Sequence, residues 1–162
     1  MKKIFLLLFS VVALSSCTDD VRDNSPAFEG LRNGSRWRAP GVVATVGAGG
    51  ELTISGGNQF ETLTLMLPTT DPGTYTLGTS ESRKAMFVVI GESETKTYAT
   101  GTGIGNGEIE IETYDEVNKT MTGTFRFNAI DEDAVDPVDP TAAETINFVE
   151  GHFYKIPVRP SL

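Results

Sequence analysis

The chain has 162 residues, of which 39% are hydrophobic, so it is long enough for one ordinary folded domain and too short for two. Its net charge is −9, from 22 acidic and 13 basic residues, and such an acidic surface argues against a nucleic-acid partner. A single Cys excludes an intrachain disulfide and a Cys-based zinc site, and a single His excludes a multi-His metal site. We therefore expect no cofactor and no bound metal.

The first sixteen residues have the composition of a signal peptide. Lys2 and Lys3 precede an apolar run over residues 4–14, which is too short to span ~30 Å of hydrocarbon as a helix. Residues 14–17 are Leu-Ser-Ser-Cys and resemble the lipobox of bacterial lipoproteins. The resemblance implies cleavage before Cys17 and acylation of its thiol, and two or three acyl chains anchor a protein stably. The alternative is an ordinary secretory signal with a Cys nearby by chance.

Residues 17–26 are expected to form a polar tether between the lipid and the folded domain. Because Thr18 follows Cys17, the enteric rule that an Asp there retains a lipoprotein at the inner membrane does not apply cleanly. Asp19 and Asp20 resemble the acidic surface-export signal of Bacteroidetes lipoproteins, and the alternative is a solvated linker. The first reading implies an outer-membrane protein that faces the cell exterior, with the membrane as its partner through the N-terminal acyl chains.

From residue 27 onward, apolar and polar residues alternate in short runs, which predicts β-strands. Asn33-Gly34 predicts a hairpin turn between the first two strands. Leu63, Leu65 and Leu67 share one face of their strand, and the apolar Lys84–Ile90 segment is expected to be a central strand. The strands predicted in this part are Ala27–Leu31, Arg36–Arg38, Val42–Val46, Glu51–Ser55, Phe60–Leu67, Gly73–Leu77, Lys84–Ile90 and Thr95–Thr100.

The clearest hairpin pairs Glu108–Glu112 with Lys119–Ile130 across a turn at Tyr114–Asn118. Its Ile residues and the side chains of Met121, Phe125, Phe127 and Ala129 are expected to face the core. Gly123 lies on the same face, which predicts a β-bulge or a close neighbour there. Two further strands, Glu144–Glu150 and Phe153–Val158, are expected to close the domain around a bend at Gly151.

These elements predict one all-β domain over residues 27–160. About ten short strands without an amphipathic helix favour an antiparallel β-sandwich or an open barrel, built mostly of meander hairpins.

Several motifs occur in a recognisable order along the mature chain. They are the lipobox Cys17, Asn33-Gly34 with Trp37, Leu52-Thr53-Ile54, the Leu63–Leu65 strand, Pro72–Tyr75, Gly107–Ile111, Asn118–Phe127 with its G-x-F-x-F core, and Gly151-His152-Phe153. In this order they resemble a family of small Bacteroidetes lipoproteins of unknown function. The resemblance implies an extracytoplasmic β domain and transfers no catalytic residue. The Asp-Pro-rich insert at 131–140 departs from it.

Motifs that could carry chemistry are weak. The Gly-rich segment 101–107 lacks the Lys-Ser/Thr pair and the following helix of a phosphate loop. The acidic segment 131–140 is expected to be a solvated loop, although its carboxylates could converge on a hard cation. The Glu108–Glu112 ladder and the lone His152 offer no nucleophile–base pair, so we expect that the protein is not an enzyme.

Exposed aromatic rings could stack on sugars or peptides. The candidates are Trp37, Tyr75, Tyr98, Tyr114 and Tyr154, and Trp37, between Arg36 and Arg38, is the first of them. The sequence thus favours a lipid-anchored binding or structural module of the cell envelope, whose partner is a glycan, a peptide or another envelope protein. The alternatives are a lipocalin-like carrier of a small apolar ligand and, less favoured, a small lipid-anchored hydrolase.

Overall fold

The chain forms eleven strands in the computed structural model, which describes residues 25–134 and 143–161. One short 3-10 turn, η1 (Glu132–Ala134), is the only helical element among these residues. The strands are β1 (Ala27–Arg32), β2 (Ser35–Arg38), β3 (Val42–Val46), β4 (Leu52–Gly57), β5 (Glu61–Leu67), β6 (Gly73–Leu77), β7 (Lys84–Ile90), β8 (Thr95–Ala99), β9 (Asn106–Asp115), β10 (Thr120–Asp131) and β11 (Thr145–Pro160). The prediction of an all-β chain is confirmed.

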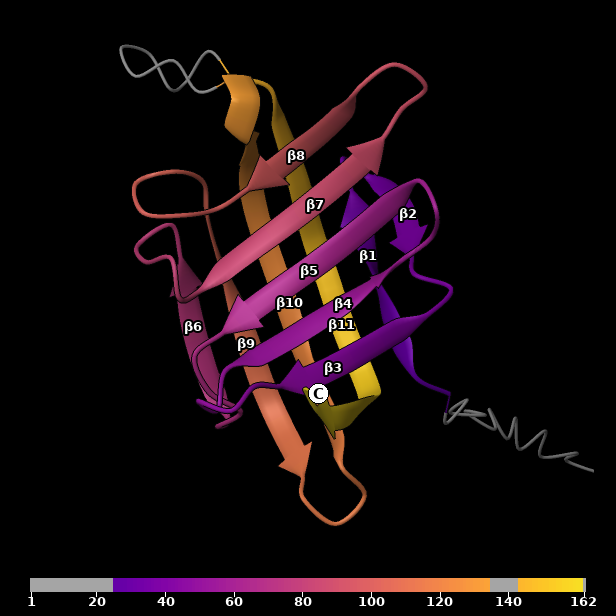
Figure 1. Cartoon of the computed structure of the whole chain (residues 1–162), viewed down its shortest axis with the longest axis vertical. Coiled ribbons are helices and arrows are strands. Elements are labelled where there is room, and N and C mark those ends of the chain that lie inside the picture. Colours follow the sequence, from indigo (N-terminus) through magenta and orange to yellow (C-terminus); the bar gives the residue numbers. More distant parts are fainter. Residues whose placement is uncertain (1–24, 135–142, 162) are drawn as a thin grey trace, which may run out of the picture.

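The strands lie in two layers that belong to one continuous mixed sheet. Strands β2-β1-β11-β10-β9-β6 form one layer, and the meander β3-β4-β5-β7-β8 crosses in front of it (Figure 1). The layers join where Val158–Pro160 at the end of β11 pairs with β3, and where Ile130 and Asp131 of β10 pair with β8. Because β10 and β11 also pair with each other, β11-β3-β4-β5-β7-β8-β10 form a closed ring, and the two-layered sandwich is a flattened barrel.

One strand pair departs from the antiparallel pattern that the local hairpins predict. The pairing of β11 with β3 is parallel, and it places the end of the chain beside an early strand. β11 is also one strand of 16 residues, although the sequence predicted two strands that meet at Gly151. Glu150 and Lys155 have positive φ values of 51° and 47° where the register shifts, and such bulges bend a strand without ending it.

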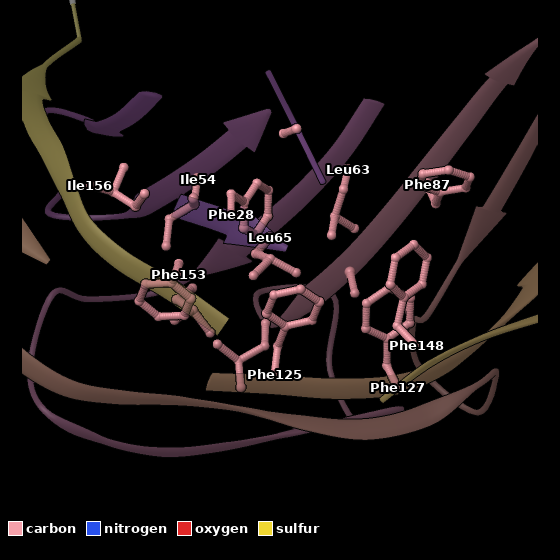
Figure 2. Close-up of a cluster of buried hydrophobic side chains, with 14 of the residues drawn as sticks. Phe28, Ile54, Leu63, Leu65, Phe87, Phe125, Phe127, Phe148, Phe153 and Ile156 are labelled. Atoms are coloured by element: carbon pink, nitrogen blue, oxygen red, sulfur yellow. The ribbon is translucent and has the colours of Figure 1, made fainter. Parts of the chain in front are cut away.

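The space between the layers is filled by apolar side chains from both of them (Figure 2). Leu63, Leu65 and Leu67 all point inward, as their alternation predicts. Rings from distant strands pack against one another, for example Phe127 on Phe148 with 4.9 Å between ring centroids. The Phe rings of this core are Phe28, Phe87, Phe125, Phe127, Phe148 and Phe153.

The predicted β9–β10 hairpin is confirmed, with its turn at residues 116–119. Ile109 lies opposite Phe125, and Ile111 lies opposite Gly123, so both Ile residues share the core face with the Phe rings. The bulge predicted at Gly123 is present between Thr122 and Gly123.

Glycines on β10 and β11 lie opposite each other's Phe residues. Gly123 pairs with Phe153, and Gly151 pairs with Phe125. A Cβ at Gly123 would lie 2.4 Å from the Phe153 ring, and a Cβ at Gly151 would lie 2.4 Å from the Phe125 ring. The two G-x-F segments are thus complementary in antiparallel register, because each ring fills the space that the opposite strand leaves empty.

Candidate functional site

Trp37, the first candidate for ligand stacking, is a core residue. Its side chain is 6% exposed and makes edge-on contacts with Phe28, Phe87 and Phe148, whose ring centroids lie 5.6–6.0 Å away. The indole Nε1 donates a hydrogen bond to Glu61 Oε2 at 3.2 Å. These contacts correct the expectation of a ligand platform, because both faces of an indole in such a cluster are covered by protein. Period-two alternation places Trp37 on one face of β2 but does not show that this face is inside.

The structure points instead to the outer face of the six-stranded layer. A row of polar side chains crosses it in register, with one residue from each of five strands. Arg38 lies opposite Glu29, Glu29 lies opposite His152, His152 lies opposite Thr124, and Thr124 lies opposite Glu110. Neighbouring residues in such a row have their Cβ atoms about 5 Å apart. The row therefore forms a continuous band of hydrogen-bonding groups across the face that does not cover the core.

Glu29 is the centre of this band, and three basic side chains surround it. His152 Nε2 lies 3.1 Å from Glu29 Oε1, and the guanidinium nitrogens of Arg36 and Arg38 lie 3.3 Å and 3.5 Å from Oε2. The Glu29 side chain is only 16% exposed, whereas Arg36 is 73% exposed. The carboxylate is therefore a shielded anchor that orients His152 and the two arginines toward solvent.

A hollow of about 410 Å³ lies over this band. Its polar lining includes Ser25, Glu29, Arg38, Glu112, Thr124 and Tyr154. His152 lines this hollow and two smaller neighbours of about 260 and 210 Å³, so it stands where the three meet. We call the largest one the His152 hollow. It offers donors from Arg38, acceptors from Glu112 and threonine hydroxyls that serve as both, beside the His152 ring whose Nε2 faces Glu29.

An amide ladder borders this face at its far end. Asn147 Nδ2 donates to Asn128 Oδ1 at 2.7 Å, and Asn128 Nδ2 donates to Asn106 Oδ1 at 3.0 Å. The backbone N–H of Asn147 in turn donates to Asn33 Oδ1 at 2.8 Å. The side chains of this ladder bind one another, so they stiffen the pairing of β9, β10 and β11.

The carboxylates that the sequence singled out are placed mainly for structure. Glu108 accepts a hydrogen bond from Arg126 Nε at 2.9 Å across the β9–β10 pair. In the acidic segment 131–140, Asp131 is buried, Glu132 pairs with Lys84 at 2.8 Å, and residues 135–140 lie outside the described part. Within residues 25–134 and 143–161, no group of three His, Cys, Asp or Glu side chains could hold a metal ion.

Several groups at turns and strand ends have shifted pKa values. Hydrogen bonds from Asn118 and from the Val117 backbone lower the pKa of Asp115. Hydrogen bonds from Thr102 lower the pKa of Glu81. The hydrogen bond from Lys96 to Glu144 raises the Lys96 pKa and lowers the Glu144 pKa, and burial raises the pKa of Tyr98 nearby. These groups lie outside the His152 hollow, whose polar groups are Glu29, His152 and their neighbours.

Sequence reasoning missed Glu29 as a site residue. Glu29 follows the buried Phe28 in the same strand, and successive side chains of a strand point to opposite faces, so alternation does predict that Glu29 points outward. Nothing in the local sequence shows that His152 and Arg38 lie beside it. The predicted lipid attachment residue Cys17 and the export residues Asp19 and Asp20 lie outside the described residues.

Two family models match the chain. Residues 24–157 match the family described as a domain of unknown function (DUF6252), and residues 1–18 match a prokaryotic membrane lipoprotein lipid attachment site. The second match includes Cys17. No curated protein and no solved structure matches the chain. No helix in the described residues is long and apolar enough to cross a membrane.

Proposed function

The chain belongs to the DUF6252 family and carries a lipoprotein attachment site, and from this premise we propose that it is a lipid-anchored binding module of the cell envelope. In this proposal Cys17 carries the acyl chains and the β domain recognises its ligand at the outer face of the six-stranded layer. The acidic Asp19 and Asp20 support export to the exterior of the outer membrane and a Bacteroidetes source.

The observation that carries the binding role is the His152 hollow. A saccharide presents several hydroxyl groups, each of which can donate and accept a hydrogen bond, and it needs both kinds of partner close together. The hollow supplies them from Arg38, Glu112, Thr124 and His152, and the half-buried ring of Tyr154 borders it. A glycan therefore fits this site better than the other partners expected of an envelope module, a peptide or a second protein.

The filled interior supports recognition at the surface rather than carriage of an apolar ligand. Side chains from both layers occupy the centre of the sandwich, and Phe28, Phe87, Phe148 and Phe153 are all fully buried there. A carrier would need a cavity of several hundred Å³ in that place. We also propose that the domain is not catalytic, because the sequence offers no nucleophile–base pair and the Glu29 carboxylate beside its one His also contacts two arginines.

Glycan binding can be tested with the mature protein on an array of bacterial and host glycans, followed by calorimetry of each hit. Thr124→Val removes one hydroxyl from the hollow and should weaken binding roughly two- to tenfold, the usual contribution of one hydrogen bond. Thr62→Val is the matched control, because Thr62 is also a half-buried strand residue but belongs to the opposite layer.

Equal loss of affinity in the Thr124 and Thr62 variants would place the binding site elsewhere. Binding of extended peptides in place of glycans, with the same sensitivity to Thr124→Val, would keep the hollow but change its ligand.

A further inference from the structure

The tether joins the domain at the end where the β9–β10 turn lies. Ala27, the first residue of β1, pairs with Tyr154 of β11, and Pro157 further along β11 pairs with Thr120 directly after the turn. Figure 1 shows the first described residues, this turn and the C-terminus toward one end of the molecule, and the β7–β8 loop and η1 at the other. We call the first of these the tether end.

The length of chain before Ser25 limits how far the tether end can lie from the lipid. Residues 17 to 25 span eight peptide units, which reach at most about 29 Å when fully extended. β10 alone has 12 residues, a length of about 40 Å, and it runs from the β9–β10 turn to η1. An acyl anchor on Cys17 therefore keeps the tether end near the membrane, whereas the opposite end can lie beyond its reach.

The side chains at the tether end have the chemistry of a membrane interface. Val117 at the tip of the turn is 91% exposed. Lys119 lies over the ring of Tyr114, with Nζ 5.9 Å from its centroid, and Lys155 lies over the ring of Tyr154 at 5.4 Å. Tyrosines beside long basic side chains are typical of the headgroup level of a bilayer, where the ring and the alkyl stem pack on apolar groups and the charge remains in water.

The tether end also carries exposed basic side chains. Lys119 and Arg159 are exposed and line one hollow of about 360 Å³ together with Tyr114. The Asp115 carboxylate accepts hydrogen bonds from the Val117 and Asn118 backbone, so it is committed to the turn, and Glu116 is the acid that faces solvent beside it.

Two basic side chains lie near η1 and the start of β8 at the opposite end. Lys84 and Lys96 form ion pairs with Glu132 and Glu144, and the exposed acid Glu92 lies in the β7–β8 loop. The exposed Lys119 and Arg159 are therefore the groups of the tether end that can meet the phosphates of an anionic lipid surface.

We propose that the tether end of the domain rests on the lipid headgroups, with the β9–β10 turn at the surface and Lys119, Lys155 and Arg159 facing the lipid phosphates. This orientation goes beyond glycan binding and depends only on the lipid attachment proposed for Cys17. It holds the β7–β8 loop and η1 away from the bilayer, whichever ligand the His152 hollow takes.

Fluorescence quenching in vesicles tests the orientation with the acylated protein. Cys17 is the only Cys of the chain and its thiol is consumed by acylation, so Val117→Cys gives one free thiol for an environment-sensitive dye. In vesicles of phosphatidylethanolamine and phosphatidylglycerol that contain a headgroup-quencher lipid, we expect strong quenching of the dye at position 117. The dye at Glu92→Cys in the β7–β8 loop is the matched control and should be quenched little.

Charge substitutions then test the contacts. Lys119→Gln with Arg159→Gln should reduce quenching at position 117, because each basic group near an anionic surface changes the partition constant roughly fivefold. Equal quenching at positions 117 and 92, or quenching at 117 that does not respond to the double substitution, would overturn the proposal. Flotation of the labelled protein with the vesicles reports the lipid anchor itself, so failure of anchoring and failure of orientation give different results.

Discussion

Single residues with no side chain determine how closely β10 and β11 approach. Gly123 and Gly151 each lie opposite a Phe of the other strand, and either glycine would place an added Cβ 2.4 Å from a ring atom. At Gly123 the Glu110 carbonyl oxygen would be closer still, at 2.0 Å. The backbone cannot move away there without breaking pairing on both sides, because β10 lies between β9 and β11.

We expect that Gly151→Ala lowers the free energy of unfolding by about 1–3 kcal/mol, because the added methyl must displace the Phe125 ring from a closely packed core. Gly41→Ala is the control, since a Cβ there meets nothing within 4 Å and should change stability by less than about 0.5 kcal/mol. Urea denaturation of both variants measures the difference. Equal urea midpoints for the two variants would show that β11 shifts to accommodate the added methyl group, and that the Gly–Phe complementarity contributes little to stability.

At the scale of elements, the β9–β10 hairpin is the clearest link between sequence pattern and core. Its alternation places Ile109, Ile111 and Phe125 inside and leaves Glu110 in solvent. A slip of one residue would expose the Phe rings and bury Arg126, so the register is strongly specified. The turn supports the same register, because Asp115 accepts hydrogen bonds from two of its backbone N–H groups.

Truncation of the core face should therefore be costly. Phe125→Ala or Phe127→Ala is expected to cost ~3–5 kcal/mol, a large share of the ~5–15 kcal/mol that stabilises an ordinary domain. Glu110→Ala on the outer face should cost less than about 0.5 kcal/mol. Thermal and urea unfolding of the three variants provides the measurement. Small and equal effects in all three would mean that the two faces of the hairpin contribute alike, contrary to the burial seen here.

At the scale of the whole molecule, the proposed binding site and the entry of the tether lie on the same layer. The six-stranded layer presents the His152 hollow, and the core between the layers is filled. The tether enters beside that hollow, which Ser25 and Ala27 help to line. The proposed anchor and the proposed binding site are therefore neighbours on the molecule.

Substitution in the N-terminal segment should separate anchoring from export. Cys17→Ser is expected to abolish palmitate incorporation and to leave an uncleaved or released precursor. Asp19→Ala with Asp20→Ala should retain palmitate but reduce the protease accessibility of the protein on whole cells. Normal palmitate labelling of the Cys17 variant would contradict lipid attachment there, and unchanged accessibility of the double Asp variant would reduce the acidic run to a linker.

Much of the fold could be predicted because strand formation and tight turns are local. Alternation located nearly every strand, Asn33-Gly34 located a turn in which both residues have positive φ, and Glu108–Ile130 predicted its own hairpin register. The lipoprotein attachment segment was equally local, because charge, an apolar run and a Cys follow one another directly. Each of these features depends on neighbours within about twenty residues, so the sequence by itself determined them.

Only the tertiary structure decided which strands lie side by side and which face is inside. β11 lies between β1 and β10 and ends in parallel beside β3, so Glu29 meets His152 from the other end of the chain. The same packing covers Trp37, which alternation alone left as a surface candidate. A period of two shows that side chains take opposite sides of a strand, but the side that is buried depends on what the second layer covers. Long-range pairing is chosen by the total burial of the two layers, and no single segment carries that information.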